Sequence, residues 1–406
     1  MTKEQIQMEA VETMRNYRFL LLQWATGLGK SKAAIDIIKD MLVDYPNARI
    51  LLVVAEIAHI SNWRAEFEKW GVNPDICVIT TYASLKHQRN NRFKLMILDE
   101  AHHAGSDLRL DILSDIHATK VLALSATMPQ DVYWSLAMLY GNDSKILNYS
   151  LQDAIKAEIL PEPSFYLVPM ILDSTTPNQL LVEEWGTKSK RVTIKCEYKD
   201  VWTYRKNRSQ YPNVRLEISC TEFQKYYEID AKMEYWRKMF MRTRNEGIKN
   251  KWLQAGSERK RFLGNLKENK AREVLALIQD KRYICFCAGI EQAEKLGGRN
   301  SIHSKKDNSL GTIEDFNNKK INSLYAIGML QEGQNLVDIE AAVIVQLDGQ
   351  ERSFIQKVGR AMRAENPVVF ILYYQYTQDE KYLKNAIEDL DTSFIQTVTD
   401  LKELEL

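Results

Sequence analysis

The sequence predicts an α/β protein with two tandem domains, each built on a parallel β-sheet. The chain has 406 residues, and compact domains usually hold about 100 to 200 residues. In both halves, short apolar runs alternate with longer amphipathic segments, which is the pattern of strands joined by crossover helices. Most of these runs are continuously apolar, as is typical of strands buried on both faces.

Five apolar runs are the expected strands of the first domain, which we place at residues 1–148. They are RFLLLQ (18–23), RILLVVA (49–55), ICVITT (76–81), KLMILD (94–99) and KVLALS (120–125). Helices are expected between them, for example over 32–42 and 58–70. In such a sheet, functional residues follow the carboxyl ends of the strands.

The second domain is expected at 149–406. A connector over 142–165 spans the boundary between the domains, and Pro161 and Pro163 end a short helix in it. Its strands are SFYLVPM (164–170), RYICFCA (282–288), SLYAIGM (323–329), AAVIVQL (341–347) and VVFILYY (368–374). Between the first two lies an expected insertion at about 186–273, with a strand RVTIKCEY (191–198) and a long helix (222–245). The C-terminal segment 379–406 is amphipathic, which predicts a helix.

The insertion concentrates the positive charge of the chain. The net charge is only +1, but residues 186–273 hold 23 Lys plus Arg against 11 Asp plus Glu. The same segment is rich in Tyr and Trp, so it offers phosphate neutralisation together with stacking surfaces for nucleic acid. The alternatives are a solvated helical surface with the aromatic residues buried behind it, or a surface for a protein partner.

No feature of the sequence indicates export, a membrane or a structural metal. The N-terminus lacks the apolar core of a secretory signal, and the longest apolar runs are shorter than the ~20 residues of a membrane span. The cysteines at 77, 196, 220, 285 and 287 have no metal-ligand spacing, so we expect core thiols in a reducing cytoplasm. His102 and His103 are adjacent but lack a third ligand, so the metal we expect is Mg²⁺ carried with a nucleotide.

The stretch TGLGKS is a candidate phosphate-binding loop. It follows a strand and precedes a helix, which is the context such a site requires. Residues Thr26, Gly27, Leu28 and Gly29 would bring backbone N–H groups to the phosphates of ATP, Lys30 would reach the β and γ oxygens, and Ser31 would ligate Mg²⁺. Trp24 stands where the full pattern has Gly. Its indole either packs beneath the loop, as we expect, or reaches the nucleotide.

The stretch LMILDEAHHAG ends a strand in two carboxylates. Asp99 there can hold Mg²⁺, and Glu100 can orient and deprotonate the water that attacks a phosphoanhydride. The alternative is a helix N-terminus at which acidic side chains are favourable.

Two further motifs fit a nucleotide site divided between the domains. In LALSATMP, Ser125 and Thr127 follow a strand, with hydroxyls that can bond toward Asp99 or His102. In FIQKVGRAMR, Gln356, Arg360 and Arg363 share one face of an expected helix, so the arginines can act as fingers on a γ-phosphate.

In this order, the four motifs resemble those of the superfamily 2 helicases and translocases, and the resemblance covers almost the whole chain. It implies two RecA-like P-loop NTPase lobes with ATP between them, and a first loop position that is commonly not Gly. It also implies that Gln7 reads adenine and that Glu332, Gly333 and Asn335 contribute to the nucleotide site. By the same resemblance, Thr80, Thr81, His303 and Ser304 lie in nucleic-acid-contacting segments. Ala55 stands where the family usually has Pro.

The expected function is an ATP-dependent motor that moves on or remodels DNA, as a monomer. DNA is favoured over RNA because the second half resembles duplex-DNA translocases of the Swi/Snf type. The alternatives are an RNA-directed remodelling ATPase, a nucleotide-gated clamp that does not hydrolyse ATP productively, and a P-loop enzyme acting on a small molecule.

Overall fold

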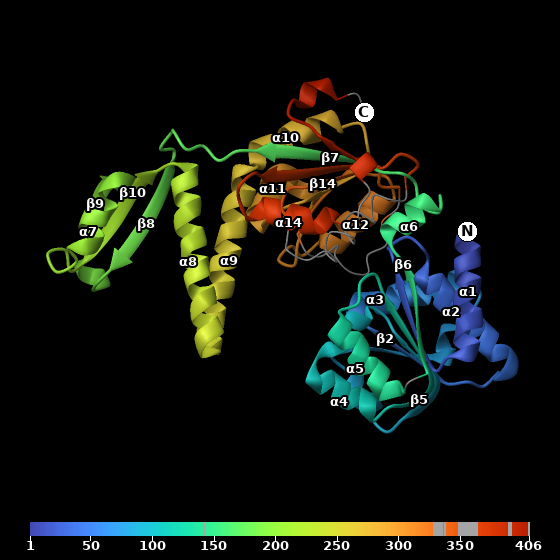
Figure 1. Ribbon diagram of the computed structural model, residues 1–406. Coiled ribbons are helices and arrows are strands. Elements are labelled where there is room, and N and C mark those ends of the chain that lie inside the picture. Colours follow the sequence, from blue (N-terminus) through green and yellow to red (C-terminus); the bar gives the residue numbers. More distant parts are fainter. Residues whose placement is uncertain (142, 328–335, 337, 348–363, 389–391, 405–406) are drawn as a thin grey trace.

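The computed structural model describes residues 1–406 except 142, 328–335, 337, 348–363, 389–391 and 405–406. Figure 1 shows two bodies, each built around a β-sheet, and an arm that projects from the second body. We call the bodies lobe 1 and lobe 2, and we call residues 179–266 the arm.

Lobe 1 contains a six-stranded parallel sheet in the order β3-β2-β4-β5-β1-β6. The strands are β1 (Phe19–Trp24), β2 (Ile50–Val54), β3 (Cys77–Thr81), β4 (Arg92–Leu98), β5 (His117–Ser125) and β6 (Ser144–Tyr149). The first five match the predicted strands. The sixth does not, because residues 144–149 were expected in a connector, whereas they pair with β1 at the edge of the sheet.

Helices cover both faces of this sheet. One apolar cluster joins it to α1 (Lys3–Asn16), α2 (Lys30–Asp44) and α3 (Ile57–Lys69). A second cluster, on the other face, joins it to α4 (Asp107–Ser114) and α5 (Gln130–Tyr140). The strand interiors are therefore buried from both sides, as their continuous apolar sequences predict.

Lobe 2 contains a seven-stranded parallel sheet in the order β12-β13-β11-β14-β15-β7-β16. The strands are β7 (Ser164–Met170), β11 (Tyr283–Phe286), β12 (Ser301–Ile302), β13 (Ser323–Ala326), β14 (Ala341–Ile344), β15 (Val368–Tyr374) and β16 (Ile395–Thr397). The predicted fold class, two tandem parallel-sheet α/β lobes of the RecA-like kind, is confirmed by the two sheets.

The helices of lobe 2 also lie on both faces of its sheet. Apolar residues of α12 (Ser309–Asn317) and α14 (Gln378–Ile387) pack on one face, and those of α10 (Glu268–Leu277) and α11 (Ile290–Gly297) pack on the other. Helix α6 (Leu151–Lys156) follows β6. The expectation of a helical C-terminal segment is only partly right, because α14 is followed by the edge strand β16, which pairs with β7.

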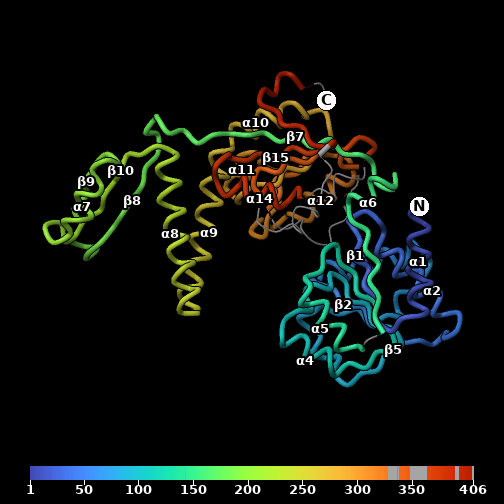
Figure 2. Tube along the Cα trace, in the orientation of Figure 1, coloured from blue at the N-terminus to red at the C-terminus, as the bar shows by residue number. Residues whose placement is uncertain are grey.

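The arm leaves lobe 2 after β7 and returns through α9 and α10, as the chain trace in Figure 2 shows. Its outer part is a three-stranded sheet, β8 (Gln179–Trp185), β10 (Val214–Cys220) and β9 (Val192–Glu197), with α7 (Val201–Lys206). Its inner part is a hairpin of two long helices, α8 (Glu222–Thr243) and α9 (Glu246–Leu266). The sheet begins at Gln179, ahead of the start expected near 186.

The base of the hairpin is bonded tightly to lobe 2. Lys267, between α9 and α10, is fully buried, and its Nζ lies 2.6 Å from Asp379 Oδ2 and donates to Val345 O at 2.8 Å. Gly264 packs so closely that an added Cβ would lie 2.1 Å from the Cβ of Ala288. The hairpin is thus continuous with the packed interior of lobe 2.

None of the helices in the described ranges is both long and apolar enough to cross a membrane.

Candidate active site

The phosphate-loop candidate connects the end of β1 to the start of α2. Gly27 and Gly29 have φ values of +101° and +83°, a region that residues with a Cβ rarely adopt. At Gly29 a Cβ would also lie 2.5 Å from Gln7 Nε2. The loop conformation therefore depends on glycine at both positions, and Thr26 and Ser31 lie partly exposed on either side.

Lys30 is the first residue of α2 and turns its ammonium group back toward the loop. Its Nζ donates to Trp24 O at 2.8 Å. Burial lowers the pKa of Lys30, and the carboxylates of Glu100 and Asp99 oppose that shift. The loop follows β1 and the acidic pair follows β4, and these parallel strands end at the same edge of the sheet, so the loop and the acidic pair converge there.

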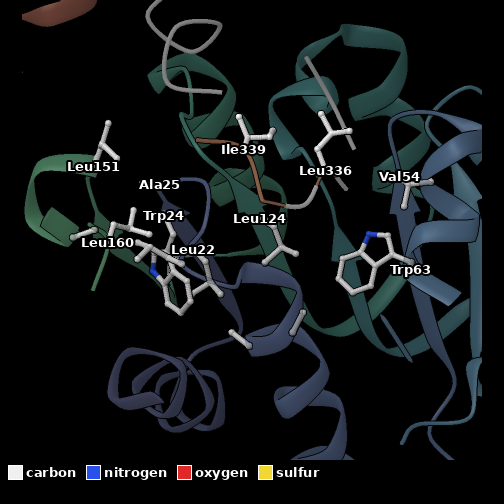
Figure 3. Close-up of a cluster of buried hydrophobic side chains, with 14 of the residues drawn as sticks. Leu22, Trp24, Ala25, Val54, Trp63, Leu124, Leu151, Leu160, Leu336 and Ile339 are labelled. Atoms are coloured by element: carbon white, nitrogen blue, oxygen red, sulfur yellow. The ribbon is translucent and has the colours of Figure 1, made fainter. Parts of the chain in front are cut away.

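Trp24 is buried beneath the loop. Its side chain has no exposed surface, and its ring meets Tyr149 edge to face at a centroid distance of 6.0 Å. Figure 3 shows the indole beside Leu22 and Leu160, in a cluster of buried apolar side chains. The expectation that Trp24 packs under the loop is confirmed.

Gln7 contacts the same loop from α1. Its side chain is only 9% exposed, and its Nε2 donates to Leu28 O at 3.3 Å. The structure therefore places the predicted adenine-reading residue against the phosphate loop.

Asp99 is held in a fixed orientation at the end of β4. The indole Nε1 of Trp63, on α3, donates to Asp99 Oδ2 at 2.7 Å, and the backbone N–H of Glu100 donates to Oδ1 at 3.1 Å. Tyr82 OH donates to the Asp99 carbonyl at 3.1 Å. A carboxylate oxygen fixed in this way is the hard donor that Mg²⁺ prefers, so the residue fits the predicted metal role.

Glu100 has a φ of +46°, in the left-handed region that is unfavourable for a residue with a long side chain. Such strain is often kept at functional sites, where the surrounding structure over-determines it. Here it turns the chain from β4 into the short helical segment Ala101–Gly105.

His102 lies between Glu100 and the end of β5, in a set of polar contacts. Its buried Nδ1 is 3.3 Å from Ser125 Oγ, and the same nitrogen lies 3.5 Å from Glu100 Oε2. Ser125 Oγ donates to Thr127 O at 2.6 Å, so Thr127 joins through its carbonyl rather than its hydroxyl. Of the two partners expected for Ser125, the structure selects His102.

Lobe 2 reaches the same region through apolar side chains. Figure 3 shows Leu336 and Ile339 of lobe 2 in one buried cluster with Leu124 and Trp63 of lobe 1. The indole that orients Asp99 therefore belongs to an apolar cluster shared by both lobes.

The predicted nucleic-acid residues are mostly buried. Thr80 and Thr81 are 9% and 7% exposed, and Thr81 Oγ1 accepts from the backbone N–H of Ser84 at 3.2 Å. His303 is buried, with Nε2 3.2 Å from Glu294 Oε1, whereas Ser304 is exposed. Of these four, only the Ser304 side chain is open to a polymer in this conformation.

Six predicted residues lie outside the described part of the chain: Glu332, Gly333, Asn335, Gln356, Arg360 and Arg363. Conversely, the sequence did not single out Trp63 and Tyr82. Trp63 occupies an apolar position of the expected helix over 58–70, so the pattern indicated a core residue, and no local signal connects it with Asp99.

Three family models match the chain. Residues 1–78 match the type III restriction enzyme res subunit, 52–133 match the DEAD/DEAH box helicase, and 266–365 match the helicase conserved C-terminal domain. Together these matches span both lobes and support a superfamily 2 helicase or translocase. The helicase models indicate a nucleic-acid-dependent ATPase, and the acidic motif of this chain reads Asp-Glu-Ala-His at 99–102.

The chain also matches individual proteins. It is 21% identical over 388 residues to the DNA 3'-5' translocase XPB2 of Sulfurisphaera tokodaii, a match that covers 90% of this chain and 80% of the relative. The crystal structure of the Pyrococcus furiosus Hef helicase domain has a TM-score of 0.49 and 14% identity, covering 94% of this chain and 96% of that one.

Proposed function

We propose that the protein is an ATP-dependent DNA helicase or translocase in which ATP hydrolysis between the lobes drives movement on DNA. The observation that carries this proposal is the position of Lys30, Asp99 and Glu100 at the same edge of the lobe 1 sheet, together with the contacts of His102 with Glu100 and Ser125. Lys30, Asp99 and Glu100 form the proposed ATPase site. The contacts of His102 join that site to Ser125 at the end of β5.

Each residue has a distinct part in the proposed hydrolysis. Lys30 leaves the Trp24 carbonyl and binds the β and γ phosphates of ATP, while Ser31 and Asp99 hold the Mg²⁺ that arrives with it. Glu100 orients the attacking water and accepts its proton. Gln356, Arg360 and Arg363 are assigned to the γ-phosphate by sequence, so that hydrolysis requires the lobes to close. Gln7 is assigned to adenine.

DNA is the proposed polymer because the sequence resembles duplex-DNA translocases, and the relative above is a DNA translocase. The basic arm supplies the phosphate contacts, with a protein partner as the alternative. We further propose that the protein is a monomer in the cytoplasm, associated with nucleic acid. We also propose a lobe boundary one residue later than the expected 148/149, because β6 of lobe 1 extends to Tyr149.

The test is ATP hydrolysis measured without polymer and with single-stranded DNA, duplex DNA or RNA. Lys30→Ala should abolish hydrolysis, because the ammonium that neutralises the phosphates is lost. Lys39→Ala is the matched control, since Lys39 is an exposed lysine on the same helix. Hydrolysis by Lys30→Ala at the rate of the unchanged protein would refute the site assignment.

The polymer series separates the alternatives. Stimulation by RNA alone would select the RNA-remodelling ATPase, and DNA binding without turnover would select the nucleotide-gated clamp.

A further inference from the structure

Helix α8 of the arm carries aromatic side chains on two opposite faces. On one face, Tyr226, Ile229 and Met233 are buried. On the other, Phe223 and Tyr227 are 50% and 61% exposed. A solvent-facing helix surface normally carries polar residues, so exposed rings gathered on one surface indicate a binding site.

The exposed rings form one stripe with two cations. At 100° per residue, Phe223, Tyr227, Tyr235, Lys238 and Arg242 fall within about 120° of the helix circumference. One carboxylate, Glu234, lies on the same arc and is paired with Arg237. Tyr235 is 55% exposed, and both cations are exposed as well. At 1.5 Å per residue the stripe is roughly 28 Å long, with the rings toward the base of the hairpin and the cations toward its tip.

Neither cation of the stripe forms an ion pair within 4.0 Å in the described part of the chain, and the carboxylate near Lys238, Glu234, is paired with Arg237. Other cations of the hairpin are paired: Lys232 with Glu258 at 2.8 Å, Arg237 with Glu234 at 2.6 Å, and Arg259 with Asp230. The charges of Lys238 and Arg242 are therefore not neutralised by ion pairs within the arm, and they remain available to phosphates.

The opposite face of α8 makes the stripe rigid. Phe240 stacks on Trp252 of α9 at a centroid distance of 5.7 Å, and Lys251 lies over the Trp236 ring at 4.6 Å. A ligand on the outer face thus meets rings whose helix is already fixed, so little ordering entropy opposes binding.

We propose that this outer face of α8 binds single-stranded DNA by stacking bases on Phe223, Tyr227 and Tyr235 while Lys238 and Arg242 contact its phosphates. The proposal rests on the proposed function, because it names the form of DNA that the arm of the motor binds. A duplex keeps its base faces stacked on each other and offers only phosphates, so the rings would be unused. Single-strand binding surfaces combine aromatic platforms with cations in this way.

The experiment compares the unchanged full-length protein with Tyr227→Leu/Tyr235→Leu. Binding of a labelled single strand of roughly 20 nucleotides, longer than a usual site, and of a duplex of equal length is measured by anisotropy without ATP. Leucine keeps the helix, because its helix propensity is high. Stacking is worth about 1–3 kcal/mol per base, so the single-strand affinity should fall at least tenfold while duplex affinity changes less than twofold.

Two controls make the result specific. Trp134→Leu removes a ring that is 56% exposed on α5 of lobe 1 and should change neither affinity. Lys238→Gln/Arg242→Gln should reduce the slope of log affinity against log salt by about 1.4, since each lost phosphate contact to a single strand contributes about 0.7, whereas the ring variant should keep the slope.

Two outcomes would overturn the proposal. One is an unchanged single-strand affinity in the ring variant, which would leave the stripe as a protein-docking surface. The other is an equal loss of single-strand and duplex affinity. ATP hydrolysis without polymer is measured on the same variants and should not change, so failure of the ATPase assignment would be seen separately from failure of the strand assignment.

Discussion

Replacing Lys267 by Met should destabilise lobe 2 by about 3–5 kcal/mol, the usual result of removing one partner of a buried ion pair. The side chain of Asp379 is only 1% exposed, and without Lys267 its carboxylate keeps Gln346 Nε2 at 2.7 Å and the Tyr374 N–H at 3.3 Å. The substitution also removes the Nζ bonds to Val345 O at 2.8 Å and Gln346 Oε1 at 3.1 Å. Methionine fills a similar volume, so the loss is electrostatic rather than a cavity effect.

Calorimetry and hydrogen exchange measure this loss. For a lobe of this size, about 2–4 °C per kcal/mol gives a melting shift of roughly 6–20 °C for the lobe 2 transition. Hydrogen exchange in β14 and β15 assigns the transition to lobe 2, because a two-lobe chain need not unfold in one step. Lys270→Met is the control, since the Lys270 pair with Glu273 is at the surface and contributes less than about 1 kcal/mol. Equal shifts in the two variants would refute the reasoning.

Three further predictions concern the nucleotide site. Burial lowers the pKa of Lys30 below its ordinary 10.5, and only the charged form attracts phosphate. ATP affinity, measured by equilibrium titration, should therefore fall as the pH rises toward 10.5. Lys30→Arg stays charged over this range, so its affinity should change less with pH. Ser125→Ala removes the hydroxyl between His102 and Thr127. A lost neutral hydrogen bond of about 1 kcal/mol should reduce DNA-stimulated turnover roughly fivefold without changing ATP affinity. An unchanged turnover rate would show that the Ser125 contact has no part in the reaction. Gly29→Ala forces a Cβ to within 2.5 Å of Gln7 Nε2 at a φ of +83° and should raise the KM for ATP at least tenfold, about 1.4 kcal/mol; Gly256→Ala, on α9 with open space around it, should leave KM unchanged.

The sequence was informative wherever one local pattern determined the structure. Continuous apolar runs located the first five strands of lobe 1, because strands buried on both faces need no polar alternation. Strand β6 was missed because an edge strand is half exposed, and its residues form neither a continuous apolar run nor a regular alternation. The short β16 was missed for the same reason, since three edge residues cannot be distinguished from an amphipathic helix.

The candidate site divides in the same way. The glycine loop and the acidic pair carry their function in consecutive residues, so their positions were predictable. The bond from Trp63 to Asp99 and the ion pair from Lys267 to Asp379 join residues far apart in the chain. Such contacts are set by helix packing and by the sheet order, and no spacing in one sequence encodes them.

The firm attachment of the hairpin to lobe 2 makes it a lever. Helix α8 has 22 residues, so its tip lies about 33 Å from its base. Because α9 is bonded to lobe 2 through Lys267, any rotation of that lobe carries the tip with it. A rotation of only about 6° displaces the tip by roughly 3.4 Å, the spacing of successive nucleotides along one strand. The hairpin thus enlarges a small rotation of lobe 2 into a displacement of several ångströms at its tip.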